Sequence, residues 1–229
     1  KKLSKKASLL SALVLTMALF AGCSNEKENQ KVADIEVKTI ATKELQDKLS
    51  DDSWVVVDTR INDAFNGWKL DEVERGGHIK GAVDFSANWL TVDSKDKEKT
   101  LDKALETKGI EKDKNIVLYD ANGKDAKEVA NYLSEKGYKN LYTYNVADWA
   151  KDESLPMESY ENYEMIVPAT IVNDILDGKK PETFENSKNI KIVEASWGEE
   201  SEAYSKGHVP TSVHINTDTV EPPAQWMLA

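Results

Sequence analysis

The chain has 229 residues, of which 40% are hydrophobic, enough for the core of one large domain or two small ones. Its formal net charge is −11 with acidic and basic residues mixed along the sequence, so a nucleic-acid partner is not expected. The single cysteine, Cys23, excludes an intramolecular disulfide and an all-cysteine metal site. Three scattered histidines do not indicate a metal site either, so we expect neither a metal nor a cofactor: these are His78, His208 and His214.

The first 22 residues have the pattern of a signal peptide. Four lysines precede an apolar run over residues 7–22, which is short for a membrane-spanning helix. The run ends in LFAG directly before Cys23, which resembles a bacterial lipobox with Phe20 where that family prefers leucine. The resemblance implies that residues 1–22 are removed and that Cys23 is lipidated. The mature chain would then face outward on the cell membrane, tethered by the polar residues 23–35; the alternative is an ordinary signal peptide and a chance cysteine.

Strand and helix patterns alternate after residue 36, which predicts an α/β fold with a parallel sheet and helices on both faces. Short apolar runs predict buried strands at residues 54–57, 116–119 and 141–144. A short helix is expected to begin at a Thr42 cap, and another helix to cover Leu101 to Lys108.

A strand, a tight loop and a helix follow one another from residue 115 to residue 136. Asp125 is expected to cap this helix with Glu128 as its capping-box partner, and Gly137 to end it. The loop that begins at Asp120 is expected to surround an anion site with backbone N–H groups above the helix N-terminus. The stretch misses the EF-hand spacing because Gly123 comes too early for a calcium loop.

Several motifs between residues 36 and 152 occur in a characteristic order. They are VVVDTR, Phe65, GHIKGAV with a following serine, the strand–loop–helix ending in GY, and a closing Trp149. Together they resemble a rhodanese domain. The resemblance implies a rhodanese-like α/β fold and the transfer of a sulfane sulfur, from a donor such as thiosulfate, by way of a loop cysteine.

The family's loop motif, Cys-x-x-Gly-x-Arg-Ser, falls here on Asp120, Gly123, Asp125 and Ala126. An aspartate cannot hold a persulfide, because sulfur transfer needs a polarisable thiolate. We expect Asp120 to fill the N–H cradle with its own carboxylate, and Asp125 to add charge that repels an anionic donor. The alternative is a metal or acid–base site built from the two aspartates. His78 is expected to have a structural role rather than a catalytic one.

The pattern restarts after a polar linker at residues 153–164. A helix is expected at residues 169–176 and a strand at residues 190–193, and GHVPTSV repeats the earlier GHIKGAV. The stretch from Ala203 to Leu228 resembles the catalytic half of two-domain sulfurtransferases of the thiosulfate and 3-mercaptopyruvate types. In that subfamily an aspartate in the first loop is usual, because only the second domain is catalytic.

Far fewer residues follow His208 than separate His78 from Trp149. Residues 165–229 are therefore expected to be the first half of a second rhodanese-like domain, poorly packed or docked on the first domain. The catalytic cysteine loop would be absent from this chain, so no catalytic residue is assigned in it. When complete, the protein would be a membrane-anchored sulfurtransferase acting on small anionic sulfur compounds. The alternatives are a non-catalytic binding or scaffold lipoprotein, and a structural lipoprotein supported by the anchor alone.

Overall fold

The computed structural model describes residues 36–199 and 202–220. The predicted signal peptide, the lipidation site Cys23, the tether and the residues from 221 onward lie outside this described part. No helix within the described ranges is both long enough and apolar enough to cross a membrane.

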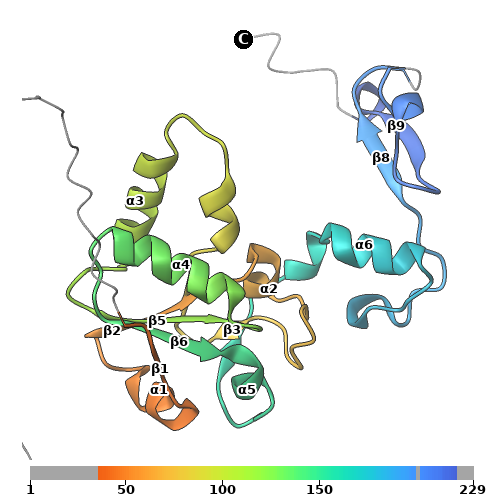
Figure 1. Ribbon diagram of the computed structural model, residues 1–229. Coiled ribbons are helices and arrows are strands. Elements are labelled where there is room, and N and C mark those ends of the chain that lie inside the picture. The colour runs from red at the N-terminus through yellow and green to blue at the C-terminus, as the bar shows by residue number, and fades with distance from the viewer. Residues whose placement is uncertain (1–35, 200–201, 221–229) are drawn as a thin grey trace, which may run out of the picture. The chain divides into compact units, whose positions relative to one another are not determined.

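A five-stranded sheet with the order β1-β6-β5-β2-β4 forms the centre of the fold (Figure 1). All four pairings between neighbouring strands are parallel. The central strand β5 is buried from Ile116 to Asp120, as expected for a strand covered on both faces. The predicted parallel sheet and its three long strands are confirmed. The strands are β1 (Lys38–Thr39), β2 (Trp54–Asp58), β4 (Val83–Asp84), β5 (Asn115–Asp120) and β6 (Leu141–Asn145).

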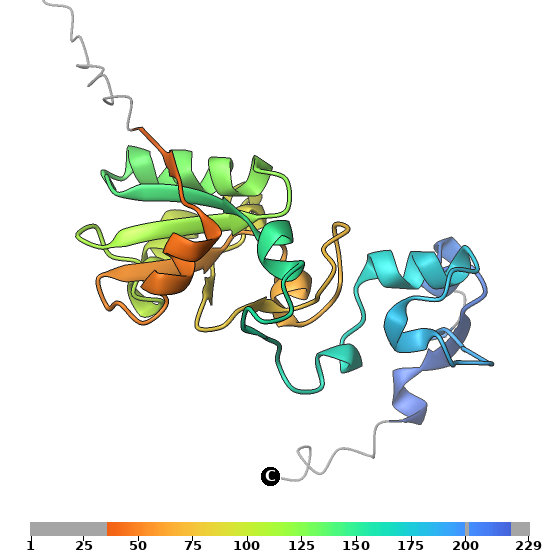
Figure 2. The same cartoon turned by 90° about the horizontal axis from the view of Figure 1, so that it is seen from below.

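Helices cover both faces of this sheet, which confirms the predicted α/β fold. Helices α3 (Lys97–Thr107) and α4 (Lys124–Glu135) lie on one face, and α1 (Thr42–Lys48) and α5 (Val146–Ala150) lie on the other (Figures 1 and 2). One apolar core fills the space under α3 and α4, and a second core fills the opposite face. The i, i+3, i+4, i+7 positions of α4 are all buried, as their spacing predicted: Ala126, Val129, Ala130 and Leu133.

Three predicted helix ends differ from those observed. Thr42 is the first residue of α1 instead of its cap, and its Oγ1 lies 2.9 Å from the hydroxyl of Tyr144. Asp125 lies inside the first turn of α4, because the carboxylate of Asp120 already accepts the N–H groups that a cap would bind. Helix α3 begins at Lys97, four residues before the predicted start. Gly137 follows α4 with φ 87°, as expected for the residue that ends a helix.

The chain crosses back over the domain after α5. Strand β7 (Met157–Glu158) pairs antiparallel with β3 (His78–Ile79). The guanidinium of Arg75 donates to four main-chain carbonyls at the end of α5 and just after it: those of Trp149, Ala150, Asp152 and Leu155. The expected linker at residues 153–164 is thus held against the domain by the main-chain pairing of β7 with β3 and by the side-chain hydrogen bond from Arg75 to the Leu155 carbonyl. Two further elements precede it, α2 (Asn62–Asn66) and the 3₁₀ segment η1 (Ala87–Thr91).

The region after residue 163 contains α6 (Ala169–Leu176), where a helix was predicted, and a parallel pair of strands, β8 (Val193–Ser196) and β9 (Val213–Asn216). The predicted strand at 190–193 was placed three residues too early, because β8 pairs only where β9 runs beside it. Trp197 is 72% exposed, and the buried residues described in this region are Pro168, Ile171 and Ser212. The remaining elements are the 3₁₀ segments η2 (Tyr163–Met165), η3 (Glu182–Phe184), η4 (Tyr204–Lys206) and η5 (Thr217–Thr219).

Candidate functional site

The loop between β5 and α4 is closed by the side chain of Asp120. Its Oδ1 accepts the N–H of Gly123 at 2.6 Å, and its Oδ2 accepts the N–H groups of Asp125 and Ala126 at 2.8 and 3.1 Å. Gly123 has φ 84°, a left-handed conformation that turns the chain back toward this carboxylate. Asp120 is buried, being only 2% exposed. The first N–H groups of α4 are therefore satisfied by the protein itself.

The structure brings Asp120, Gly123 and Asp125 together as the sequence suggested, but the two carboxylates have different surroundings. Asp120 makes three hydrogen bonds, whereas Asp125 is half-buried with no side-chain hydrogen bond among those described. Burial and then the nearby charge of Asp120 raise the pKa of the Asp125 carboxyl above its usual value. An anion approaching this loop would meet two acidic groups and no unoccupied N–H cradle.

A cavity of about 500 Å³ opens beside the loop at the carboxyl ends of β1, β5 and β6. Ligand sites of open parallel sheets usually lie at this edge. The cavity wall includes two aspartates and no lysine, arginine or histidine, so it gives an anionic sulfur compound no cationic partner. The lining residues are Thr39, Ile40, Ala41, Thr42, Asp120, Asn122, Gly123, Thr143, Tyr144, Asn145 and Asp148.

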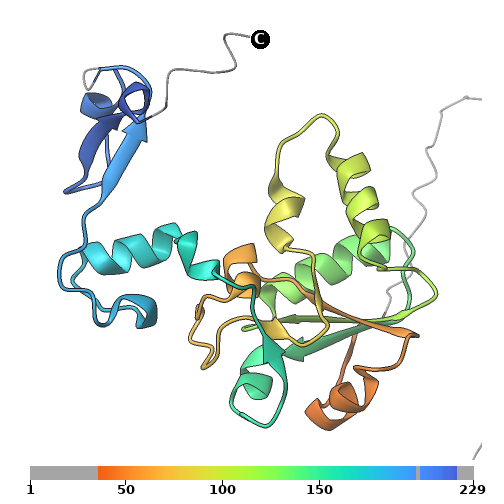
Figure 3. The ribbon, with the colours of Figure 1, turned by 180° about the vertical axis from the view of Figure 1, so that it is seen from behind.

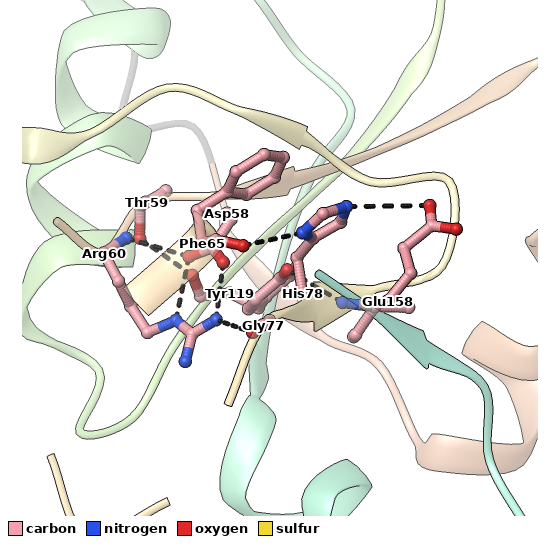
Figure 4. Close-up of polar contacts among 9 residues, drawn as sticks. Asp58, Thr59, Arg60, Phe65, Gly77, His78, Tyr119 and Glu158 are labelled. Atoms are coloured by element: carbon pink, nitrogen blue, oxygen red, sulfur yellow. Dashed lines mark hydrogen bonds and ion pairs between the residues drawn. The ribbon is translucent and has the colours of Figure 1, made fainter. Parts of the chain in front are cut away.

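A buried ion pair stands at the end of β2, the strand next to β5 (Figure 4). The Nε and Nη2 atoms of Arg60 donate to the two carboxylate oxygens of Asp58 at 3.0 and 2.6 Å, and Nη2 also donates to the carbonyl of Gly77 at 2.7 Å. Both side chains are at most 2% exposed. Burial alone would lower the pKa of Arg60, but the hydrogen bond and charge of Asp58 outweigh it and raise that pKa. This pair is enclosed in the fold and cannot reach a ligand.

Tyr119 lies against this ion pair from β5. Its ring is 5.6 Å from the Arg60 guanidinium carbon, and its hydroxyl accepts the N–H of Ile79 at 3.2 Å. Burial, followed by the charge of Asp58, raises the pKa of Tyr119 well above its usual value. Tyr119 is therefore an uncharged structural link between β5 and β3.

His78 has the structural surroundings that were expected of it. Its Nδ1 lies 2.7 Å from the carbonyl oxygen of Phe65, and since a carbonyl only accepts, Nδ1 carries the proton (Figure 4). The ring stacks on Phe65 with centroids 3.8 Å apart, and Nε2 lies 3.6 Å from Glu158. His78 does not line the cavity beside the loop. In the described part of the chain, no group of three or more histidine, cysteine or acidic side chains is arranged to hold a metal.

The geometry of this domain agrees with a comparison against protein families. Residues 41–149 match the family model described as "Rhodanese-like domain". They form a rhodanese-like domain. No curated protein matches the chain.

Solved structures resemble more of the chain than the rhodanese-like domain alone. An EanB complex with ergothioneine is 30% identical with a TM-score of 0.71, and the match covers 83% of this chain and 43% of that one. The anaerobic ergothioneine biosynthesis enzyme from Chlorobium limicola, bound to its natural substrate trimethyl histidine, is 30% identical with a TM-score of 0.70, covering 82% of this chain and 43% of that one. In a further EanB structure ergothioneine is covalently linked with a persulfide cysteine. The present chain thus spans less than half the length of these structures.

Two residues that hold the rhodanese-like domain together carried little signal in the sequence. Arg75 and Tyr119 act through contacts with residues far away in the chain, which local patterns do not reveal. A buried tyrosine in an apolar strand was a weak hint, because its hydroxyl needs a hydrogen-bond partner.

Proposed function

We propose that the chain is part of a sulfurtransferase of the rhodanese type and that its residues 41–149 are the non-catalytic half. The observation that carries this proposal is the Asp120 carboxylate, which binds the N–H groups of Gly123, Asp125 and Ala126. A sulfurtransferase loop would present those N–H groups to a cysteine and its sulfur cargo. Here the same donors serve protein stability.

In this proposal residues 165–229 begin a second rhodanese-like copy, after a linker at residues 153–164. In the parallel pair β8 and β9, Val193 lies opposite Val213. In the parallel pair β2 and β4, Val57 lies opposite Val83 in the same way. In both pairs the Gly-His repeat lies between the two strands, since GHIKGAV ends at Val83 and GHVPTSV ends at Val213. The match to EanB also extends well past residue 149. The catalytic cysteine would belong to the completed second copy, because Cys23 is the one cysteine of these 229 residues.

The substrates proposed for the complete protein are small anionic sulfur compounds, thiosulfate or 3-mercaptopyruvate, with a thiophilic acceptor. The cationic groups that bind such an anion would come from the second copy, since the cavity beside Asp120 lacks them. We also propose that Cys23 is lipidated after removal of residues 1–22, which would anchor the protein on the outward face of the cell membrane.

A non-catalytic function is the second candidate. The ordered, closed loop of the rhodanese-like domain supports it, because a stable fold without a thiol can serve as a binding or scaffold lipoprotein. The exposed Trp197 and Met165, at 72% and 80%, would then belong to a contact surface.

A thiosulfate-to-cyanide sulfur-transfer assay separates the two candidates. The 229-residue chain should be silent under both, whereas a version extended by a complete second copy should be active only as a sulfurtransferase. The intact mass of the native protein, extracted from membranes with detergent, supplies the second measurement. A mass equal to residues 23–229 plus lipid favours the scaffold, and a mass larger by about 50–80 residues favours the enzyme.

A further inference from the structure

A second cavity, separate from the loop of Asp120, lies between η1 and α3. It has a volume of about 400 Å³, within the range of about 300–1,000 Å³ that is usual for small-molecule sites. Figure 3 shows η1 and α3 (Lys97–Thr107) as two neighbouring segments joined by one loop. The residues that line this second cavity are Trp89, Val92, Ser94, Lys97, Thr100, Leu101 and Ala104. None of them borders the cavity beside Asp120.

The apolar part of this wall is fixed by the core beneath it. Leu101 is buried, and Trp89 and Ala104 pack against the same core cluster. The indole N–H of Trp89 donates to Asn62 at 3.1 Å, and its ring meets Phe85 edge-on at 5.4 Å, so the ring cannot swing to close the cavity. Val92, at the rim, leaves 51% of its surface in water. An apolar ligand would therefore gain contact with a surface that exists before it binds.

One cation stands at this wall without an acidic partner. Lys97 donates from Nζ to the carbonyl of Leu90 at 2.8 Å, and none of the described carboxylates lies within ion-pair distance of it. By contrast, Lys108 pairs with Asp84, and Lys136 pairs with Asp102. An ammonium has three donors, so Lys97 keeps two donors for a ligand while the Leu90 carbonyl holds it in place.

We propose that this cavity binds a small amphipathic carboxylic acid, with its aliphatic chain between Trp89 and Leu101 and its carboxylate on Lys97 Nζ. The argument for this occupant is complementarity: an apolar wall with one partly buried, unneutralised ammonium matches a ligand with one apolar chain and one negative head. The hydroxyl of Thr100 donates to the carbonyl of Asp96, so it is already engaged and adds only an acceptor oxygen. Lys97 therefore supplies the charge selectivity of the site.

Calorimetric titration of the full chain with octanoate and with octan-1-ol tests the proposal. Octanoate should bind more tightly than octanol. Lys97→Met should lower the affinity for octanoate by about tenfold and leave the affinity for octanol nearly unchanged. Lys103→Met is the matched control, because Lys103 is exposed on the same helix and does not line the cavity. It should change neither affinity by more than about twofold.

A cavity-filling variant, Ala104→Leu, keeps the test decisive if Lys97→Met fails to fold. It should abolish binding of both ligands while its thermal unfolding midpoint stays near that of the wild type. The proposal is overturned if octanoate shows no saturable binding, if octanol binds as tightly as octanoate, or if Lys103→Met weakens octanoate as much as Lys97→Met. Undiminished binding by a folded Ala104→Leu variant would overturn it as well.

Discussion

At the scale of single residues, three backbone N–H groups converge on one carboxylate, that of Asp120, at 2.6 to 3.1 Å. Hydrogen bonds to a charged acceptor are stronger than neutral ones, and a buried donor left without an acceptor costs free energy. Asp120 is thus a stabilising residue, at the position that the proposed function assigns to the nucleophile of a sulfurtransferase loop.

The variant Asp120→Ala leaves these N–H groups without their acceptor. We expect the free energy of unfolding to fall by about 1–3 kcal/mol, measured by urea denaturation. Asp113→Ala, which removes an exposed aspartate of the same domain, is the control and should stay within about 0.5 kcal/mol of the wild type. Equal stability of the Asp120 and Asp113 variants would contradict the role given to the carboxylate.

Asp125 gives the loop a pH dependence whose sign follows from its pKa. Because burial and the charge of Asp120 raise that pKa above the ordinary 3.8, ionised Asp125 is less favourable in the folded chain than in the unfolded one. Below the unfolded-state pKa the Asp125 carboxyl is protonated in both states and does not destabilise the fold. As the pH rises through the folded-state pKa, this favourable condition is lost and the ionised carboxylate lowers the free energy of unfolding. Asp125→Asn should therefore be more stable than the wild type at neutral pH, with a gain that shrinks as the pH falls toward 3.8.

Carbon-detected NMR titration of the Asp125 carboxyl measures the shift directly. The midpoint should lie above that of a free aspartate side chain and should move down in Asp120→Asn, because that change removes the largest charge contribution to the shift. A midpoint below that of a free aspartate side chain, or one that is unchanged by Asp120→Asn, would show that the electrostatic account of the loop is wrong.

At the scale of elements, the return of the chain over the rhodanese-like domain depends on a close approach at Gly77. A side-chain Cβ at this position would lie 2.3 Å from the carbonyl oxygen of Glu158 in β7, and the residue has φ 86°. Gly137 has nearly the same φ of 87°, but a Cβ there would meet only the end of a lysine side chain at 4.0 Å. The two glycines share the backbone conformation and differ in the steric clash.

The two glycines predict different losses in the free energy of unfolding when each is replaced by alanine. Gly137→Ala should cost about 1 kcal/mol from the left-handed backbone alone. Gly77→Ala should cost clearly more and should raise amide hydrogen exchange at Met157 and Glu158, because β3 and β7 can no longer pair without moving. If both substitutions lower the free energy of unfolding equally and the β7 amides stay protected from exchange, the pairing of β7 with β3 does not depend on the close approach at Gly77.

The elements differed in how far the sequence alone predicted them. Strand β5 and helix α4 were predicted from their local periodicity, because one buried strand and one amphipathic face leave a clear pattern. The start of β8 was misplaced, since a strand begins where its partner lies and β9 is far away in the sequence. At the site, the cradle around Asp120 involves residues within six positions and was foreseeable, whereas the four carbonyls bound by Arg75 lie more than seventy residues away from it.

At the scale of the whole molecule, one sheet with two apolar cores forms the rhodanese-like domain, and the described residues after 163 add few buried side chains to it. This division agrees with the proposal of a finished non-catalytic copy followed by the start of another. Under that proposal the catalytic thiolate lies outside residues 41–149, because sulfur transfer needs a thiolate and the loop of this domain has a carboxylate.

Titrating the isotope-labelled 229-residue chain with thiosulfate, followed through its backbone amide signals, tests the central claim most directly. If Asp120 occupies the cradle, the signals of Gly123, Asp125 and Ala126 should not move with thiosulfate, and no thiocyanate should form when cyanide is added. Saturable shifts of these three signals, or sulfur transfer by the chain, would contradict the claim that the loop of this rhodanese-like domain is closed by its own carboxylate.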